Sequence, residues 1–414
     1  MKKVGGTLFI ITLLSIVIFL DWYVFQGIKA ILPADYLTLG KTTYWILTGT
    51  IAVWLGFTFY TIMQEGKISP SSQQSLNLFL VILVTQLTVI VFLFGEDLIR
   101  VIGTVYSYAT GITNENGSLM ASRRKFISQI AFAVAAIPMT GFIYGIIKGK
   151  YDFRTIKKTL YFKDLPEAFD GFTITQLSDI HAGSFKDYAA VKKGADMAAS
   201  QQSDLFVFTG DLVNHKADEI DPMIDIFSQI KAPYGQFSIL GNHDYGDYTS
   251  WPNPEAKAQN LQSLKGKHKM MGFDLLLDEN RIIEKDGQRI SLLGVENWGL
   301  GFQSKGDLEK SLVDVPDDAF KVLLSHDPTH WDEQVKNHPK NIHLTLSGHT
   351  HGIQIGIETP FIRWSPAQYR YTNWAGIAEQ AGKYLYVNRG FGFHAFAGRV
   401  GIWPEITVIE LKKG

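Results

Sequence analysis

The strongest constraint on the fold of this 414-residue chain is a set of long apolar runs in its first third. Three of them, Thr42–Gln64, Leu76–Gly95 and Phe126–Ile147, contain no charged residue. At a rise of about 1.5 Å per residue, a helix of this length crosses a hydrocarbon core of about 30 Å. A fourth run, Val4–Ile28, is interrupted by Asp21 alone. The sequence therefore predicts an all-α transmembrane region of about four helices over residues 1–150.

Asp21 has two interpretations. It stands beside Trp22 and Tyr23, and aromatic residues gather at membrane interfaces, so we favour a position near an interface. The alternative is an acid inside the membrane with a functional role.

Charge and histidine divide the chain at the same point. Residues 1–150 hold 17 of the 79 charged residues, and all eleven histidines follow residue 150. Residues 151–414 therefore form a separate, soluble domain. The net charge of −1 provides no basic excess to neutralise phosphates, which argues against a nucleic-acid partner. The absence of cysteine excludes disulfides, thiolate metal sites and cysteine nucleophiles.

The orientation in the membrane depends on the segment Ala121–Ile127, which contains Arg123, Arg124 and Lys125. It resembles an internal twin-arginine export signal, and an ordinary cytoplasmic basic anchor is an equal alternative. Both place these charges in the cytoplasm and send the chain after Ile147 outward. Four crossings from a cytoplasmic N-terminus would return it inside, unless residues 97–112 make a weak fifth crossing. We expect a multi-pass cell-membrane protein with an extracytoplasmic catalytic domain.

The soluble domain alternates β-rich and helical segments, which indicates an α/β fold with a largely buried sheet system. The expected strands are Phe172–Leu177, Asp204–Thr209, Gln236–Leu240, Arg281–Glu284, Arg289–Gly294, Lys321–Ser325, Ile342–Ser347, Tyr384–Asn388 and Glu405–Leu411. The expected helices are Lys186–Ser200, Ile220–Ile230 and Glu255–Gly272.

Five of the expected strands end in polar clusters that together supply possible metal ligands. These clusters contain Asp179 and His181; Asp211; Asn242, His243 and Asp244; His326; and His349 and His351. Ligand sites of α/β sheets lie beyond the carboxyl ends of strands. The set exceeds the coordination of one ion and suits two, as in two-metal hydrolases. Nitrogen and oxygen ligands without sulfur favour Mn, Fe or Zn.

These clusters resemble the signature of calcineurin-like metallophosphoesterases. The blocks are Asp179-x-His181, Gly210-Asp211, Gly241-Asn242-His243-Asp244, His326 and Gly348-His349-Thr350-His351, in that family's order over about Phe172–Leu411. The resemblance implies a four-layer α/β sandwich of mixed sheets over residues 151–414. Ser325–Pro328, Ser347–Gly352 and Val387–Gly390 resemble the membrane-associated or exported bacterial branch.

The resemblance also implies a role for each matching residue. One divalent or trivalent ion would be held by Asp179, His181 and His351, and a second by Asn242, His326 and His349. Asp211 would bridge them. A hydroxide between the ions would attack phosphorus, and His243, oriented by Asp244, would donate a proton to the leaving oxygen.

Two positions depart from the family pattern. Asn214 stands where purple acid phosphatases have a tyrosine ligand, and Ile353 stands where this branch has a glycine. The first departure argues against a tyrosinate-bound ferric site. Outside the motif blocks, we expect Arg389, His330 and His394 as contacts to the substrate, with a structural role as the alternative for each.

The predicted function is that of a membrane-anchored dinuclear-metal phosphohydrolase that cleaves a phosphoester or pyrophosphate bond. Anchoring to the bilayer favours a lipid-linked substrate, because it brings the site and the substrate to one surface. Some proteins of this branch resemble UDP-diacylglucosamine pyrophosphohydrolases, whose substrate requires a cytoplasmic site. The alternative function is a membrane metal-binding sensor or scaffold without turnover.

Overall fold

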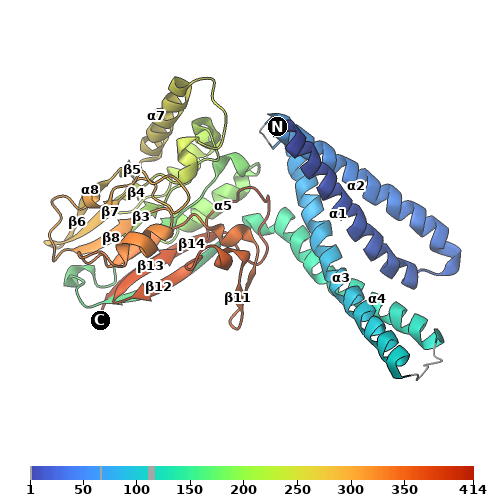
Figure 1. Cartoon of the computed structure of the whole chain (residues 1–414). Coiled ribbons are helices and arrows are strands. Elements are labelled where there is room, and N and C mark those ends of the chain that lie inside the picture. Colours follow the sequence, from blue (N-terminus) through green and yellow to red (C-terminus); the bar gives the residue numbers. More distant parts are fainter. Residues whose placement is uncertain (1, 66–67, 111–116) are drawn as a thin grey trace. The chain divides into compact units, whose positions relative to one another are not determined.

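The computed structural model describes residues 2–65, 68–110 and 117–414, which fall into two compact units, Met1–Tyr144 and Gly145–Gly414 (Figure 1). Among the described residues, the first unit is helical and the second contains the strands. This division lies within a few residues of the boundary predicted from charge and histidine content.

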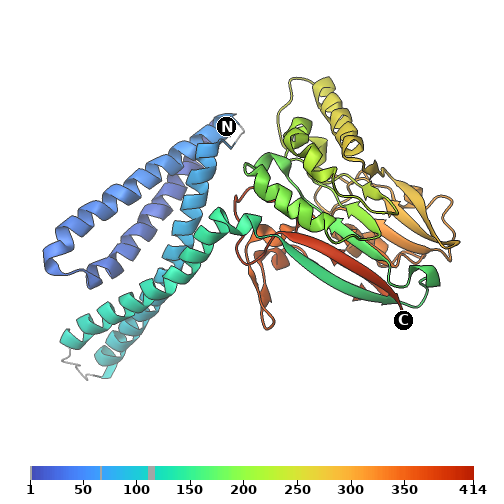
Figure 2. The same cartoon turned by 180° about the vertical axis from the view of Figure 1, so that it is seen from behind.

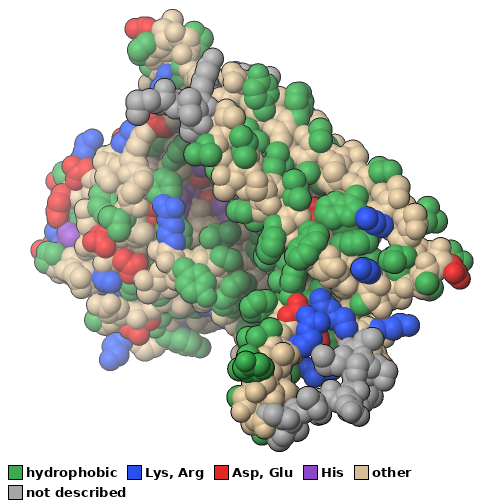
Figure 3. Space-filling view, turned by 45° about the vertical axis from the view of Figure 1, so that its right-hand side comes forward, with side chains coloured by type: hydrophobic (Ala, Val, Ile, Leu, Met, Phe, Trp, Pro, Cys, Tyr) green, Lys and Arg blue, Asp and Glu red, His purple; other side chains and the backbone are tan. Residues whose placement is uncertain are grey.

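The helical unit consists of four long helices: α1 (Lys2–Ile31), α2 (Leu37–Glu65), α3 (Pro70–Thr110) and α4 (Gly117–Ile147). Each is long and apolar enough to cross a membrane. Their outward side chains are largely apolar, and Figure 3 shows these side chains gathered over the helical unit. Residues 97–110, where a weak fifth crossing was considered, continue α3 without a break. The last two residues of that segment lie outside the described residues.

Several polar side chains inside the helical unit pair with one another. The carboxylate of Asp21 is buried and accepts hydrogen bonds from Gln86 Nε2 (2.5 Å) and from the hydroxyl of Tyr44 (3.2 Å). Arg124 Nη1 donates to Glu96 Oε2 (2.6 Å) and Asp97 Oδ1 (2.8 Å), which ties α4 to α3. Asp21 therefore lies between helices, bonded to groups from α2 and α3.

The second unit contains two six-stranded mixed sheets. The first has the order β1 (Arg154–Phe162), β14 (Glu405–Lys413), β2 (Thr173–Leu177), β3 (Leu205–Phe208), β4 (Gln236–Ser238) and β5 (Asp274–Leu275). The second has the order β12 (Gly376–Gln380), β13 (Lys383–Val387), β9 (Leu344–Ser347), β8 (Phe320–Leu324), β7 (Gln288–Gly294) and β6 (Glu279–Lys285). A separate hairpin joins β10 (Ile357–Glu358) to β11 (Arg363–Trp364).

The sheets stack face to face and helices cover their outer faces (Figures 1 and 2). The inner core joins side chains such as Val207 of the first sheet and Leu346 of the second. On the outer face of the first sheet, Phe206 packs with side chains of α5 (Tyr188–Ala199), α6 (Ile224–Phe227) and α7 (Pro254–Met271). The outer face of the second sheet meets α8 (Leu308–Ser311) and the turn Trp331–Val335. This arrangement is the predicted four-layer sandwich.

Local sequence signals explain several element ends. Asn253 caps α7 by accepting a hydrogen bond from Ala256 N, and the helix stops at Gly272 in a left-handed conformation. Asp286 and Gly287 both adopt positive φ and form the predicted tight turn between β6 and β7. The expected helix Ile220–Ile230 is shorter, because a 3-10 segment with Pro222 precedes α6. Strands β1, β5, β10, β11 and β12 were not predicted.

Candidate metal centre

The predicted ligands follow parallel strands whose carboxyl ends meet at one edge of the sandwich. Strands β2, β3 and β4 run parallel in the first sheet, and β8 and β9 in the second. Directly after these strands, Asp179, Asp211 and His349 adopt positive φ angles of 53°, 59° and 71°. Such a backbone is rare outside glycine and is typical of functional turns. It bends each loop sharply, so that the side chains reach one another.

The first group of ligands joins Asp179, His181 and His351. One ligand atom from each lies within 4.8 Å of the others, and all three side chains are buried. Nε2 of His351 lies 3.3 Å from Oδ1 of Asp179. These are the residues that the resemblance assigned to the first ion.

The second group joins Asp211, His326 and His349 within the same 4.8 Å limit. Oδ2 of Asp211 lies 3.2 Å from Nε2 of His326 and 3.6 Å from Nε2 of His181. Oδ2 of Asp211 therefore faces one ring nitrogen from each of the two groups.

Asn242 precedes His243, whose backbone N–H donates to Oδ1 of Asp211 (2.8 Å). Nδ2 of Asn242 donates to the hydroxyl of Tyr248 (2.9 Å), while its buried Oδ1 has no hydrogen-bond partner among the described residues. An unpaired buried acceptor is costly unless a group such as a cation binds there. The residues present thus fit divalent metal ions.

Hydrogen bonds behind the ligands orient their rings. Nδ1 of His326 donates to the carbonyl oxygen of Thr209 (2.7 Å), which leaves Nε2 free to face Asp211. Nδ1 of His181 lies 3.0 Å from Oδ1 of Asn214, which has the same effect. For His349, Nε2 faces Oδ2 of Asp327 at 3.3 Å, so Nδ1 is the atom turned toward His326.

The electrostatics of the centre suit cation binding. Burial lowers the pKa of His181, His349 and His351, which keeps these rings neutral. Burial alone would raise the pKa of Asp211, but the neighbouring His326 holds it well below its ordinary value. In return, Asp211 raises the pKa of His326 to about 10 against the effect of burial.

His243 lies beside the two groups, and its hydrogen bond differs from the predicted one. Nδ1 of His243 donates to the carbonyl oxygen of Asn214 (3.0 Å). Asp244, which we expected to orient this ring, accepts hydrogen bonds from four backbone N–H groups, those of Asp211, Leu212, Val213 and Gly241. Asp244 therefore ties the loop after β3 to the loop after β4, and the Asn214 carbonyl orients His243.

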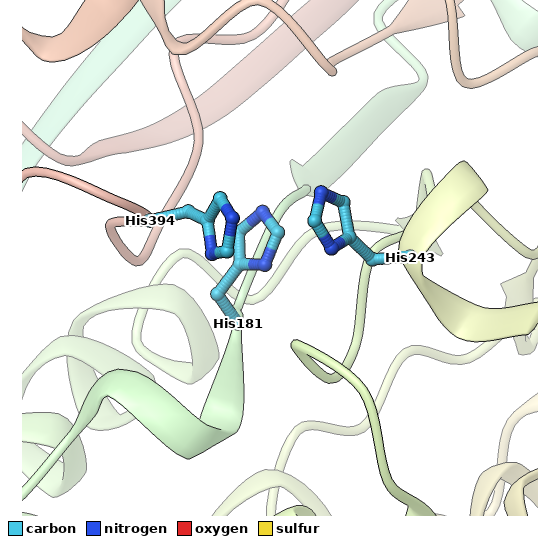
Figure 4. Close-up of side chains that lie close together, drawn as sticks. All are labelled: His181, His243 and His394. Atoms are coloured by element: carbon cyan, nitrogen blue, oxygen red, sulfur yellow. The ribbon is translucent and has the colours of Figure 1, made fainter. Parts of the chain in front are cut away.

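His394 joins the centre from the loop after β13. Figure 4 shows its ring beside those of His181 and His243, and one ring nitrogen of each lies within 4.8 Å of the others. The rings of His394 and His181 stack at 4.8 Å. Burial lowers the pKa of His394 to about 3, so the ring stays neutral.

Arg389 and His330, the other two residues expected to contact substrate, are not brought into this cluster. Arg389 is buried and paired with Glu358 and Glu405. His330 is fully buried between Ser325 Oγ (2.8 Å) and Gln334 Oε1 (3.2 Å). Both side chains are thus engaged with other protein groups, and their contact with a substrate stays a prediction.

Sequence reasoning missed three residues that hold the centre together. Asp327 and Tyr371 both contact Nε2 of His349, the latter at 3.0 Å. The fully buried Arg399 donates to Nδ1 of His351 (3.0 Å) and to the carbonyl oxygens of Arg389 (2.7 Å) and Gly392 (2.9 Å). Asp327 follows a ligand directly, which could have drawn attention to it, whereas Arg399 stands alone in the sequence.

The sequence patterns of two known families match the chain. The one described as "Calcineurin-like phosphoesterase" matches residues 172–352, and the one described as "Probable Calcineurin-like phosphoesterase, transmembrane domain" matches residues 6–150. A relative from Bacillus subtilis (strain 168), the uncharacterized metallophosphoesterase YkuE, is 31% identical over 300 residues. That match covers 70% of this chain and 98% of the relative.

Two further relatives carry different descriptions. A transmembrane protein with metallophosphoesterase domain from Danio rerio is 26% identical over 336 residues, covering 76% of this chain and 72% of its own length. The UDP-2,3-diacylglucosamine pyrophosphatase LpxG from Chlamydia muridarum (strain MoPn / Nigg) is 28% identical over 276 residues, covering 55% of this chain and 81% of its own length.

The fold and the ligand groups define a metal-dependent hydrolase of phosphoester bonds that carries a membrane domain. The chain belongs to the calcineurin-like metallophosphoesterase family.

Proposed function

We propose that this protein cleaves a phosphoester or pyrophosphate bond of a lipid-linked substrate with two metal ions of the Mn, Fe or Zn class. The observation that carries the proposal is the position of Asp211, whose Oδ2 faces ligand nitrogens of both groups at 3.2 and 3.6 Å. Two bound ions would supply a hydroxide nucleophile near neutral pH and neutralise charge on the phosphate.

The side chains divide the work. Asp179, His181 and His351 would hold the first ion and Asn242, His326 and His349 the second, with Asp211 shared. His243, fixed through Nδ1, presents Nε2 toward the space beside the ligands, where it donates a proton to the leaving oxygen. His394 lies against His243 at 4.4 Å between ring centres and contacts the substrate as a neutral group.

The lipid-linked substrate rests on the membrane domain and on the likeness to LpxG, a pyrophosphatase of a diacylated sugar nucleotide by its name. The side of the membrane decides which lipids are reachable. Four crossings place the N-terminus and the catalytic domain on one side, opposite the segment with Arg123 and Lys125. If this segment is cytoplasmic, the catalytic domain is extracytoplasmic, which favours envelope phospholipids over nucleotide-linked lipids.

An assay on the full chain in lipid nanodiscs tests the catalytic proposal. With Mn²⁺ added, it should hydrolyse p-nitrophenyl phosphate or its bis ester, and Asp211→Asn should remove the activity. Asp286→Asn, at an exposed turn, is the matched control. Metal-loaded protein with no turnover on a panel of mono-, di- and pyrophosphate esters would contradict the proposal. A reporter fused to the C-terminus tests the orientation, and a cytoplasmic signal would overturn it.

A further inference from the structure

The hairpin formed by β10 and β11 carries large apolar side chains into solvent. Phe361 is 95% exposed, and Ile357, Ile362 and Trp364 are also exposed. Figure 1 shows this hairpin, marked by the β11 label, extending from the body of the α/β unit. Exposed apolar groups gathered in this way indicate a surface that another apolar phase covers.

The tip of the hairpin, Thr359–Ile362, carries no charge. Glu358 and Arg363 flank the tip directly and pair with each other, with Nε of Arg363 3.4 Å from Oε1 of Glu358. Glu358 also accepts a hydrogen bond from Nε of Arg389 (2.9 Å). An apolar tip that adjoins a neutralised pair of charges matches the change in polarity at a membrane surface.

The backbone of the tip satisfies its own hydrogen-bond donors. The N–H of Thr359 donates to the carbonyl oxygen of Ile362 (2.9 Å). The N–H groups of Phe361 and Ile362 donate to Oγ1 of Thr359 at 3.3 and 3.0 Å, and Pro360 has no N–H. Backbone groups that enter lipid must be paired internally, because lipid offers no hydrogen bonds. The N–H groups of this turn meet that condition. A turn exposed to water would not need internal partners, because its N–H groups could donate to water.

The root of the hairpin lies where the chain leaves its last membrane helix. The N–H of Gly356 donates to the carbonyl oxygen of Val400 (2.9 Å), and the N–H of Arg399 donates to that of Gly145 (3.1 Å). Gly145 belongs to the last turn of α4, whose apolar span ends at Ile147. At about 3.3 Å per residue, four residues carry the tip up to about 13 Å from this root.

We propose that the hairpin tip Thr359–Ile362 inserts into the lipid interface next to the end of α4. A membrane accounts for this surface better than a protein partner, because four residues offer far less than the roughly 800 Å² that each side of a stable protein interface buries. The hairpin connects the loop of His351 to Tyr371, a contact of His349. Insertion thus holds the ligand-bearing loop at the bilayer surface. The inference does not depend on the catalytic proposal.

The absence of cysteine allows a direct test, since one introduced thiol is the only one in the chain. Full-length Phe361→Cys and Ile362→Cys variants are labelled with an environment-sensitive fluorophore and reconstituted in vesicles of phosphatidylcholine and phosphatidylglycerol. Asp286→Cys, at the tip of the β6–β7 hairpin, is the matched control. Each tip variant keeps one of the two apolar residues. The two variants therefore report on insertion independently, even if one substitution weakens it.

We expect lipids with a quencher on the acyl chain to remove most of the emission at positions 361 and 362 and none at position 286. Iodide in the water should quench only position 286. Equal quenching by iodide at all three positions overturns the proposal. Protection from iodide without quenching by the labelled lipid overturns it as well, because a second copy or a protein partner would then cover the tip.

Discussion

Nδ1 of His181 lies 3.0 Å from Oδ1 of Asn214. The amide nitrogen of Asn214 donates to Ser184 Oγ (3.0 Å), which fixes the amide so that its oxygen faces the imidazole. The ring proton of His181 therefore lies on Nδ1, and Nε2 presents its lone pair to the metal site. Asn214 acts on the centre through His181.

This relationship predicts the effect of Asn214→Leu. Removing the acceptor releases the ring of His181, and metal affinity should fall by about 10- to 100-fold. Asn214→Asp keeps an acceptor oxygen and should preserve metal binding. Calorimetric titration of the metal-free protein with Mn²⁺ measures both, and equal affinities for the Leu and Asp variants would contradict the assigned role.

Asp211→Asn and Asp179→Asn should differ in the number of ions bound. Asp211 faces both ligand groups, so Asp211→Asn should lower the metal affinity of both sites. The loss should exceed about 100-fold, which is roughly the largest effect expected from a residue that contacts a ligand but not the metal. Asp179 belongs to one group, so its variant should retain one ion. Metal analysis after desalting tests this, and the same stoichiometry in both variants would remove the bridging role from Asp211.

His243→Ala should slow the reaction without loss of metal. A general acid contributes about 10²- to 10⁴-fold, so substrates with alkoxide leaving groups should suffer most and p-nitrophenyl esters least. His394→Ala, which removes the neighbouring ring, should raise KM without this dependence on the leaving group. If His243→Ala instead loses metal, the group of His181, His243 and His394 holds an ion and His243 is a ligand.

The buried His268 predicts acid sensitivity of the fold. It lies in α7, and its Nδ1 is 2.9 Å from Ser238 Oγ. Burial lowers its pKa to about 3, below the unfolded value near 6.5. The stability associated with the neutral ring is therefore present above pH 6.5 and is lost as the pH falls toward 3, by up to about 1.4 kcal/mol per pH unit. In denaturant unfolding, the free energy of unfolding of His268→Gln should fall less steeply with decreasing pH than that of the unchanged protein. Equal slopes would show that His268 does not cause the acid sensitivity.

Ile353 is a β-branched residue at a φ of 51°, and its side chain is exposed. A left-handed backbone costs such a residue about 1–2 kcal/mol, whereas glycine adds about 0.4–1 kcal/mol of unfolded-state entropy. Ile353→Gly should therefore stabilise the protein by about 1 kcal/mol. Ile353→Ala keeps the Cβ atom and serves as the control. Thermal unfolding of both variants checks the prediction, which fails if Ala stabilises as much as Gly.

Patterns along the chain predicted the elements whose signals are local. Uncharged runs marked α2, α3 and α4, continuous apolar residues marked β3, and Asp286-Gly287 marked the β6–β7 turn. β1 was missed because most of its side chains are exposed or half-buried, so its sequence has no clear apolar pattern. Its pairing with β14 holds it as a strand. The ends of α3 were also misjudged, because its charged residues Asp97 and Arg100 pair with each other and the helix continues past them.

The sequence alone determined which residue types can act as ligands in the centre, because Asp, Asn and His follow the ends of several buried strands along the chain. Only the tertiary structure decided how these ligands are held. Asp244 accepts hydrogen bonds from backbone N–H groups. Arg399 donates to His351, 48 positions away in the sequence. Arg389 forms a buried ion pair with Glu405. Such contacts join residues that are distant in sequence, and the folded sheets alone bring them within hydrogen-bond range. The charge-free tip at Phe361 is visible in the sequence, but the pairing of the hairpin root at Gly356 with Val400, next to Arg399 and its contact with Gly145, is a property of the fold.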